Sequence, residues 1–184
     1  MRVVIAPDSF GGTLSAVEAA DAIAAGWSRG AAADELRLFP LADGGSGFVD
    51  VLRSSLGGCV HEVTVTGPVG GAQVAARWLR VEGDGRVVGY LEAAQACGLH
   101  LVAAVSPETA RAATSRGVGE LIAVVDRAGV DELVIGLGGS ACTDGGAGAM
   151  AALGATPLAA DGEQLPDGGA ALSGVAALSG PVRM

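Results

Sequence analysis

Short apolar runs alternate with helix-length segments over the first third of the chain, and this order constrains the fold more than any other feature. We expect strands at residues 3–6 and 36–40, and helices at residues 15–27 and 48–56. Ser15, followed three residues later by Glu18, is a capping-box pattern at the start of the first helix. A strand-helix-strand-helix order favours parallel neighbouring strands, so the sequence predicts an α/β fold with a parallel sheet.

The pattern changes near Cys59. Alternating, β-branched stretches follow at residues 63–66, 74–81 and 86–92, separated by Gly-Pro and Gly-Asp-Gly turns that are typical of antiparallel hairpins. We therefore expect a domain boundary here, with residues 1–58 forming the first part and residues 59–184 a second α/β domain. Helical patterns return at residues 106–113 and 118–128, and an apolar strand follows at residues 133–137.

Composition limits the classes of function. The chain has 184 residues, of which half are apolar and 3% aromatic, so the core is expected to be aliphatic, with Trp27 and Trp78 as its bulky members. All 11 basic residues are arginines, which excludes a Walker-type lysine and a Schiff-base lysine. A formal net charge of −9 repels the nucleic-acid backbone, so we expect no nucleic-acid partner.

The cysteines and the hydropathy of the chain indicate the cellular compartment in which the protein works. Cys59, Cys97 and Cys142 are odd in number and widely spaced, without a zinc-binding or disulfide pattern, and this favours a reducing compartment. No secretory signal and no uninterrupted apolar stretch of transmembrane length occurs. We expect a cytoplasmic protein that does not enter a membrane.

A glycine-rich loop follows the strand at residues 133–137 and precedes an alanine-rich, helix-forming stretch. Gly138, Gly139, Gly145 and Gly146 permit close backbone approach, and backbone N–H groups at a helix start attract anions. Ser140, Thr143 and Asp144 add hydroxyls and a carboxylate, a mixture that suits a phosphate accompanied by Mg²⁺. A tight turn without a ligand is the alternative explanation for these glycines.

Two more polar loops follow the first two expected strands. They read Asp8-Ser9-Phe10 and Asp43-Gly44-Gly45. Functional loops of open α/β sheets lie at the carboxyl ends of the strands, so the two loops are expected to share one edge of the sheet. Asp43 is placed to accept a hydroxyl proton or hold Mg²⁺, and Asp8 with Ser9 to bind hydroxyls or a metal. Both acids also fit ordinary turn and capping positions.

The three phrases at residues 6–10, 40–45 and 138–146 together resemble the bacterial glycerate kinase (glycerate 2-kinase) family. Weaker stretches at residues 91–99 and 114–122 agree in order and spacing, so the resemblance spans nearly the whole chain. It implies a flavodoxin-like domain, incomplete here, with an inserted α/β domain resembling restriction endonucleases. Family members are much longer than this chain, which corresponds to their N-terminal half, and they usually carry lysine where Gly11 stands.

The activity that the resemblance implies is the ATP-dependent phosphorylation of D-glycerate, with ATP and Mg²⁺ as cofactors. The ligands of the protein would then be D-glycerate and ATP, and the protein could assemble as a homodimer. Combined with the loops above, it implies catalytic roles for Asp43 and Asp8, substrate contacts at Ser9, Phe10, Gly44, Gly45, Ser115 and Arg116, nucleotide contacts at Gly138, Gly139, Ser140, Thr143, Gly145 and Gly146, and a metal ligand in Asp144. Arg116 is the candidate for a bidentate contact with the glycerate carboxylate.

Two other functions stay open at this point. Gly136, Gly138 and Ala141 match a G-x-G-x-x-A dinucleotide fingerprint, with Asp161 as a conceivable ribose acid, which predicts an NAD- or FAD-binding oxidoreductase. Gly11 in the place of the family lysine and the shortness of the chain favour a third hypothesis, a non-enzymatic nucleotide-binding module.

Overall fold

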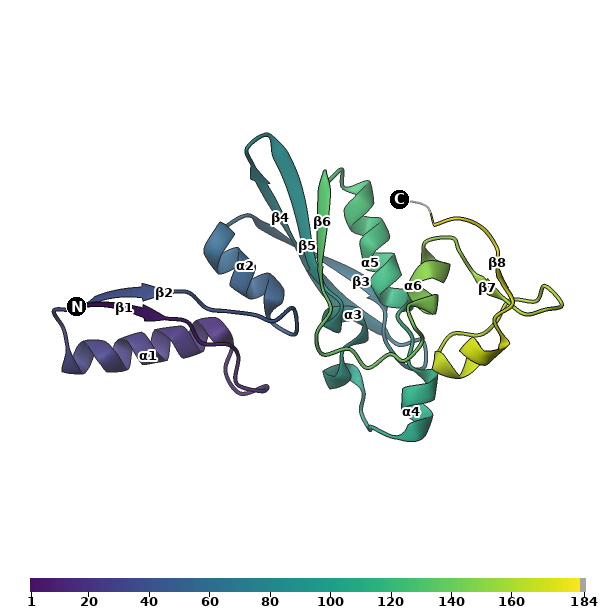
Figure 1. The fold of residues 1–184 in the computed structure, drawn as a ribbon, viewed down its shortest axis with the longest axis horizontal. Coiled ribbons are helices and arrows are strands. Elements are labelled where there is room, and N and C mark those ends of the chain that lie inside the picture. The colour runs from purple at the N-terminus through teal and green to yellow at the C-terminus, as the bar shows by residue number, and fades with distance from the viewer. Residues whose placement is uncertain (183–184) are drawn as a thin grey trace.

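The computed structural model describes residues 1–182, in which the chain forms three separate sheets (Figure 1). The first pairs β1 (Arg2–Ile5) with β2 (Glu35–Leu38) in parallel. The second has the order β3 (Cys59–Thr66), β4 (Gln73–Gly83), β5 (Arg86–Glu92) and β6 (Glu132–Gly136). The third pairs β7 (Pro157–Leu158) with β8 (Ala177–Leu178) in antiparallel fashion. The fold is therefore mixed α/β with parallel pairing in two of its sheets.

The N-terminal unit consists of β1, the helix α1 (Ala16–Gly30) and β2. Ser15 caps α1 as expected: its Oγ accepts from the Glu18 N–H at 3.2 Å, and the Glu18 carboxylate accepts from the Ser15 N–H at 2.8 Å. Strand, helix and parallel strand follow one another as the sequence predicts, with Arg2 opposite Glu35. The local signals in this region are thus confirmed.

Large apolar side chains of the N-terminal unit remain exposed. Val4 is 65% exposed and Phe39, just after β2, is 52% exposed. Trp27, expected in the core, is 40% exposed, and its indole N–H donates to the Asp34 carboxylate at 3.0 Å. Figure 1 shows why: α1 lies along the two strands and the unit extends away from the rest of the protein. A pair of strands and one helix cannot cover both faces of their own sheet.

The four-stranded sheet, which we call the central sheet, carries the main core. β3, β4 and β5 are antiparallel neighbours, which confirms the predicted hairpins, and β6 pairs in parallel with β5. Helix α5 (Arg116–Arg127) buries its apolar face against the sheet, and the resulting core contains the buried side chains Val65, Ala76, Trp78, Leu91, Leu121, Ile122 and Val125. The helix α6 (Ala147–Ala152) packs beside α5.

Helix α2 (Phe48–Leu56) has the predicted bounds and packs against β4 and β5 of the central sheet. Figure 1 shows α2 and α5 on opposite sides of that sheet. Val49 of α2 is fully buried, and Asp50 forms an ion pair with Arg77 of β4 at 3.0 Å. A helix from the first third of the chain therefore joins the central sheet, while the division of the chain at residue 58 stays a prediction.

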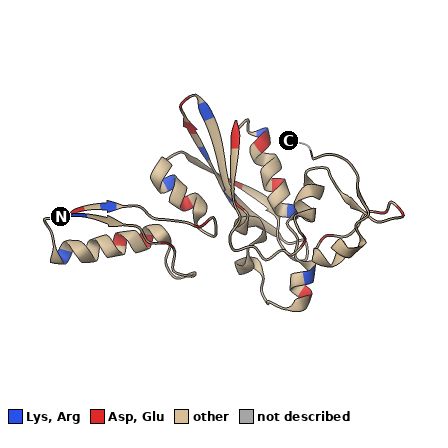
Figure 2. Cartoon of the chain, in the orientation of Figure 1, with Lys and Arg blue, Asp and Glu red and all other residues tan. Residues whose placement is uncertain are grey.

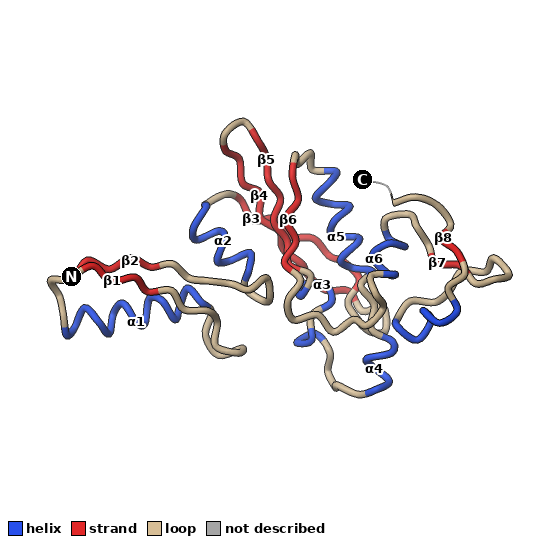
Figure 3. The backbone as a smooth tube through the Cα atoms, in the orientation of Figure 1, coloured by secondary structure: helices blue, strands red, loops and turns tan. Residues whose placement is uncertain are grey.

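The crossover from β5 to β6 is irregular before α5. It contains α3 (Ala94–Cys97), a 3-10 turn η1 (Leu99–Leu101) and α4 (Pro107–Ala112). A second 3-10 turn, η2 (Gly169–Gly174), precedes β8. The tube in Figure 3 shows how much of this region is loop. Among the described residues, no helix combines the length and apolar character needed to cross a lipid bilayer.

Charged side chains are spread over the molecule. In Figure 2 the arginines lie on several helices and strands rather than on one element. The chain as a whole carries a formal net charge of −9. The absence of a nucleic-acid partner stays a prediction.

Candidate active site

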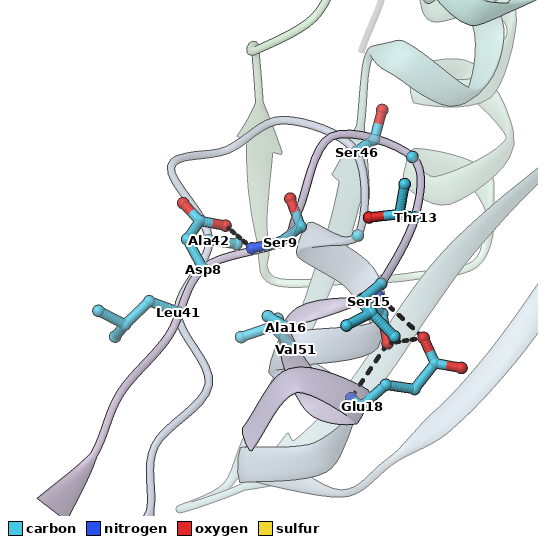
Figure 4. A pocket seen from close by; sticks show the side chains of 13 residues that line it. Asp8, Ser9, Thr13, Ser15, Ala16, Glu18, Leu41, Ala42, Ser46 and Val51 are labelled. Carbon is cyan, nitrogen blue, oxygen red and sulfur yellow. Dashed lines mark hydrogen bonds between the residues drawn. The ribbon is translucent and has the colours of Figure 1, made fainter. Parts of the chain in front are cut away.

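The loops that follow β1 and β2 border an open cavity of ≈ 310 Å³, which we call the loop cavity (Figure 4). Eight of its thirteen lining residues are polar or glycine, and the first turn of α1 lies along one side. The lining residues with side-chain oxygens are Asp8, Ser9, Thr13, Ser15, Glu18 and Ser46. Figure 4 shows Asp8 and Ser9 on one side of this cavity and the capped start of α1 on another.

A second cavity of ≈ 610 Å³, the sheet cavity, lies between the same loops and the central sheet. Its wall combines Arg77 of β4 with Glu92, Gln95 and His100 from the end of β5 and the segment after it. Gly12 and Ser46 line both cavities, so the two adjoin. The site thus offers two carboxylates and several hydroxyls at the loop cavity, and an arginine, a histidine and the Glu92 carboxylate at the sheet cavity.

Asp8 and Ser9 lie where the sequence predicts, at the carboxyl end of β1, and both line the loop cavity. The Asp8 Oδ1 accepts from the Ser9 N–H at 2.6 Å, which fixes the carboxylate in an exposed position. Phe10 begins a tight turn in which its C=O accepts from the Thr13 N–H at 2.9 Å. The Phe10 ring is 55% exposed and does not line either cavity.

Asp43 occupies a turn rather than the cavity wall. Its Oδ1 accepts from the Gly45 N–H at 2.9 Å, which is the geometry of an Asx turn. Its neighbours Ala42 and Ser46 line the loop cavity, whereas Asp43, Gly44 and Gly45 do not. The predicted catalytic carboxylate is therefore exposed at the edge of the site.

The glycine-rich loop packs directly on this turn. The Gly138 N–H donates to the Gly44 C=O at 3.0 Å. A Cβ at Gly138 would lie 2.7 Å from the Gly45 Cα, and a Cβ at Gly136 would lie 2.6 Å from the Gly44 oxygen. Glycine is needed at both positions because two backbones meet there. We expected the Gly138 N–H to be free to bind phosphate, but it is bonded to the Gly44 C=O instead.

The rest of the loop is also held internally. Residues 137–146 form the loop between β6 and α6, and α6 begins at Ala147, as the sequence predicts (Figure 3). The Thr143 hydroxyl donates to the Ala110 C=O at 2.7 Å, and the Gly146 N–H donates to Asp144 at 3.1 Å. Ser140 is exposed, and with Gly139 and Gly145 it keeps a solvent-facing position, although none of them lines either cavity.

Asp144 is buried, not presented to a metal. Its side chain is fully buried, and its carboxylate accepts from the Ser115 N–H at 2.8 Å, the Ser115 hydroxyl at 2.9 Å and the Gly148 N–H at 3.0 Å. Burial alone would raise the pKa of this carboxyl, but the hydrogen bonds from Ser115, Gly148 and Gly146 outweigh it and lower the pKa. Asp144 therefore satisfies N–H groups at the start of α5 and α6. Within residues 1–182 no group of three His, Cys, Asp or Glu side chains is placed to hold a metal ion.

Ser115 and Arg116 are likewise engaged away from the cavities. Ser115 is buried, and its Oγ accepts from the Ala149 N–H at 3.0 Å while donating to Asp144. The Arg116 guanidinium makes a bidentate pair with Asp167, at 2.5 Å from Nε and 2.8 Å from Nη2. That pairing raises the pKa of Arg116. The fork expected to bind a glycerate carboxylate is taken up by an aspartate of the same chain.

Sequence reasoning missed Arg77, Gln95 and His100 as site residues. They come from a hairpin strand and from the segment after β5, and only the fold brings them together. Glu92 did carry a signal, since an acid ending an apolar strand sits where α/β sheets place functional groups. Its carboxylate accepts from the Gly47 N–H at 3.2 Å and the Val49 N–H at 3.1 Å, so it caps α2 next to Ser46.

Three comparisons with known proteins agree on one family. The family model described as the glycerate kinase family matches residues 3–180. An uncharacterised protein of Mycobacterium bovis is 54% identical over 155 residues, which cover 84% of this chain and 40% of the relative. The glycerate kinase of Bacillus subtilis is 43% identical over 178 residues, which cover 97% of this chain and 46% of the relative.

The fold agrees as well. The crystal structure of a Salmonella typhimurium LT2 protein assigned as glycerate kinase 2 matches with a TM-score of 0.77 at 40% identity, over 97% of this chain and 47% of that one. The chain thus spans somewhat less than half the length of the relatives it matches. With a family match over almost every described residue and relatives well above 30% identity, the chain belongs to the glycerate kinase family.

Proposed function

We propose that the protein containing this chain phosphorylates D-glycerate with ATP in the cytoplasm. The observation that carries the proposal is the pair of adjoining cavities, one lined by Asp8 and Ser9 and the other by Arg77, which share Ser46. Phosphoryl transfer requires an oriented hydroxyl, a proton acceptor and compensation of negative charge, and these groups supply them. Family membership and the glycerate kinase names of relatives support the same activity.

The proposal includes the finer fold assignment. The parallel β1-α1-β2 arrangement fits part of a flavodoxin-like domain, and the central sheet with its helices fits the inserted domain that resembles restriction endonucleases. The sheet cavity is then lined by residues of both parts, and ligand sites are common at such domain interfaces.

Arg77 takes the role that we expected of Arg116. Glycerate carries a carboxylate, and among residues 1–182 Arg77 is the arginine that lines either cavity. One of its nitrogens, Nη2, pairs with Asp50 at 3.0 Å, and Asp50 itself does not line the cavity. The Gln95 Oε1 accepts from the Arg77 backbone N–H at 2.7 Å, which holds the Gln95 amide at the same wall. The sheet cavity therefore suits the carboxylate end of the substrate.

The hydroxyl end of glycerate then points toward the loop cavity. Asp8, fixed by the Ser9 N–H, accepts the proton of the attacking hydroxyl, and Ser9 and Ser46 orient it by hydrogen bonding. Asp43 is the second candidate acceptor at the edge of the site. In the glycine-rich loop, the exposed Gly139, Ser140 and Gly145 keep the nucleotide-binding role implied by the family resemblance.

The donor set also fits the metal that accompanies ATP. Mg²⁺ in such enzymes is held by one or two carboxylates together with phosphate oxygens, not by a cage of protein ligands. Asp8 and Asp43 are exposed, and each has one carboxylate oxygen engaged by a backbone N–H, so these two residues are the candidates to hold it. When bound, Mg²⁺ neutralises charge on the phosphates. Asp144 is no longer a candidate, because its buried carboxylate is occupied by five internal donors: the Thr114 hydroxyl, the Ser115 N–H, the Ser115 hydroxyl, and the Gly146 and Gly148 N–H groups.

The dinucleotide hypothesis is not supported. Its fingerprint requires a helix that starts at once after the strand, so that the helix N-terminus meets the pyrophosphate. Residues 137–146 intervene here before α6 begins. The non-enzymatic module remains as an outcome of the test below.

The test is a binding and turnover experiment on the purified protein. Calorimetry should show binding of D-glycerate and of Mg·ATP, and a coupled assay should show ADP release that depends on D-glycerate. Binding of Mg·ATP without glycerate binding or ADP release would leave only a nucleotide-binding module. No binding of either ligand would contradict the proposal.

The proposed contact between Arg77 and the glycerate carboxylate is tested separately. The test compares the wild type with Arg77→Gln, using glycerate and its neutral amide, glyceramide. The wild type should prefer glycerate over glyceramide by about ten- to a hundredfold, because a hydrogen bond to a charged group contributes roughly 1.5–3 kcal/mol. Arg77→Gln should abolish this preference. The control is Arg80→Gln on the same strand, whose side chain pairs with Glu82 and lines neither cavity. An unchanged preference in Arg77→Gln would exclude Arg77 while leaving the kinase activity standing.

A further inference from the structure

Two of the three cysteines lie in contact. The Sγ atoms of Cys97 and Cys142 are 3.7 Å apart, although 45 positions separate the two residues in the sequence. Cys97 ends α3, and Cys142 lies in the glycine-rich loop after β6. The sequence offered no reason to pair them, because their spacing fits neither a metal site nor a redox motif.

The backbones around the two thiols are held side by side. The Ala141 N–H donates to the Cys97 C=O at 2.7 Å, and Gly98 and Ser140 form an antiparallel bridge. In this register Cys97 lies opposite Ala141, so Cys142 is its diagonal neighbour, one residue further along the loop. The two Sγ atoms, 3.7 Å apart, must approach to about 2 Å to form a disulfide.

The two thiols differ in access. Cys97 is 1% exposed and belongs to the core, whereas Cys142 is only partly buried and leaves a route for a small oxidant. Cys59 is exposed on β3 and makes no part of this contact. A thiol that is both partly accessible and next to a second thiol is suited to reversible oxidation.

We propose that Cys97 and Cys142 form a modification site that hydrogen peroxide converts to a disulfide. The two sulfurs lose two electrons in total and form the S–S bond, and the O–O bond of the peroxide breaks. The two thiol protons end in the two water molecules that the peroxide becomes. A dithiol reductant reverses the reaction by thiol-disulfide exchange, leaving its own disulfide as the oxidised product.

The disulfide would tie the glycine-rich loop to α3. Gln95 of α3 lines the sheet cavity, and Gly138 of the loop contacts the turn at Gly44. Cross-linking these segments limits the movement of the loop, and it restricts the unfolded chain, so the oxidised protein should melt at a higher temperature. This inference does not depend on the proposed kinase activity.

Peptide mapping by mass spectrometry under non-reducing conditions tests the site. After treatment with hydrogen peroxide, we expect a peptide linking Cys97 to Cys142 that is lighter by two hydrogen atoms, while Cys59 stays free for alkylation. Treatment with dithiothreitol should remove the link and return the melting temperature to its original value.

Two variants make the result specific. Cys59→Ser, the control, should form the same internal link, and Cys142→Ser should form none and show no rise in melting temperature on oxidation. The proposal is overturned if Cys97 and Cys142 remain free under peroxide, or if the disulfide that forms joins two molecules through Cys59. Both results can be read without any activity assay.

Discussion

The N-terminal unit and the central sheet differ in how completely they bury the apolar side chains of their strands. Both combine apolar strands with amphipathic helices, yet Leu91 of β5 is fully buried while Val4 of β1 is 65% exposed. The central sheet has α2 on one side and α5 on the other, whereas the N-terminal unit has α1 alone (Figure 1). Apolar character therefore does not by itself place a residue in a core. The number of elements available to cover each face decides it.

The largest expected effect tests where the stability lies. Leu91→Ala should lower the free energy of unfolding by about 2–5 kcal/mol, because it leaves a cavity in the central core. Val4→Ala, the matched change in the N-terminal unit, should change it by less than about 0.5 kcal/mol. Urea unfolding followed by circular dichroism measures both. Similar losses for the two variants would contradict the comparison.

The second prediction concerns the buried acid that joins α5 to α6. Asp144→Ala should cost about 2–4 kcal/mol, since it leaves buried N–H groups of Ser115 and Gly148 without an acceptor. Asp43→Ala, an exposed acid with one backbone contact, is the control and should cost about 1 kcal/mol or less. Equal costs would show that the network around Asp144 does not stabilise the fold.

Asp144 also predicts a dependence on pH. Its pKa in the folded protein lies below the reference value of 3.8, so its contribution is fully present above that pH and is lost as the pH falls through the folded pKa. Asp144→Asn should flatten the loss of stability below about pH 3.8, since it removes the titrating group. Thermal melts at a series of pH values provide the measurement, and an unchanged slope would exclude Asp144 as its source.

A smaller effect is expected where the two loops touch. Gly138→Ala places a methyl group against Gly45 and should cost about 1–3 kcal/mol through backbone displacement. Gly146→Ala is a poor control because of its positive φ, whereas Gly30→Ala at the end of α1 meets no atom within 4 Å. Gly30→Ala should leave stability nearly unchanged. If Gly138→Ala also leaves the free energy of unfolding unchanged, the two loops can move apart enough to accommodate a methyl group.

The smallest predicted effect concerns Glu92. Glu92→Gln removes the negative charge at the start of α2 but keeps a side-chain acceptor, so we expect a loss of about 1 kcal/mol. Glu82→Gln, on an exposed strand position, is the control and should lose less. Chemical denaturation compares the two, and a cost for Glu92→Gln no greater than the control would argue against a role in holding α2.

Local signals predicted the elements well. The Ser15 capping box, the turn after residue 66 and the helix at 48–56 each depend on residues close in sequence, and each is confirmed. The site was harder, because Arg77 and His100 are brought to one cavity only by the fold. Gly138 was predicted correctly as a position where another group approaches the backbone closely. The sequence could not tell whether that group is a phosphate or a second backbone segment, because glycine allows both. Asp144 could not be assigned because its donor Ser115 lies 29 residues away.

The anchoring of α2 has a mechanical consequence. Glu92 and the Asp50–Arg77 pair hold this helix to the central sheet, although it follows β2 directly in sequence. Any rotation of β1, α1 and β2 relative to the sheet must therefore be absorbed by the short connection at residues 39–46. That connection carries Ala42 and Ser46, so the pivot is itself part of the cavity wall. Turning one half of the protein against the other would change the shape of the space in which a substrate has to fit.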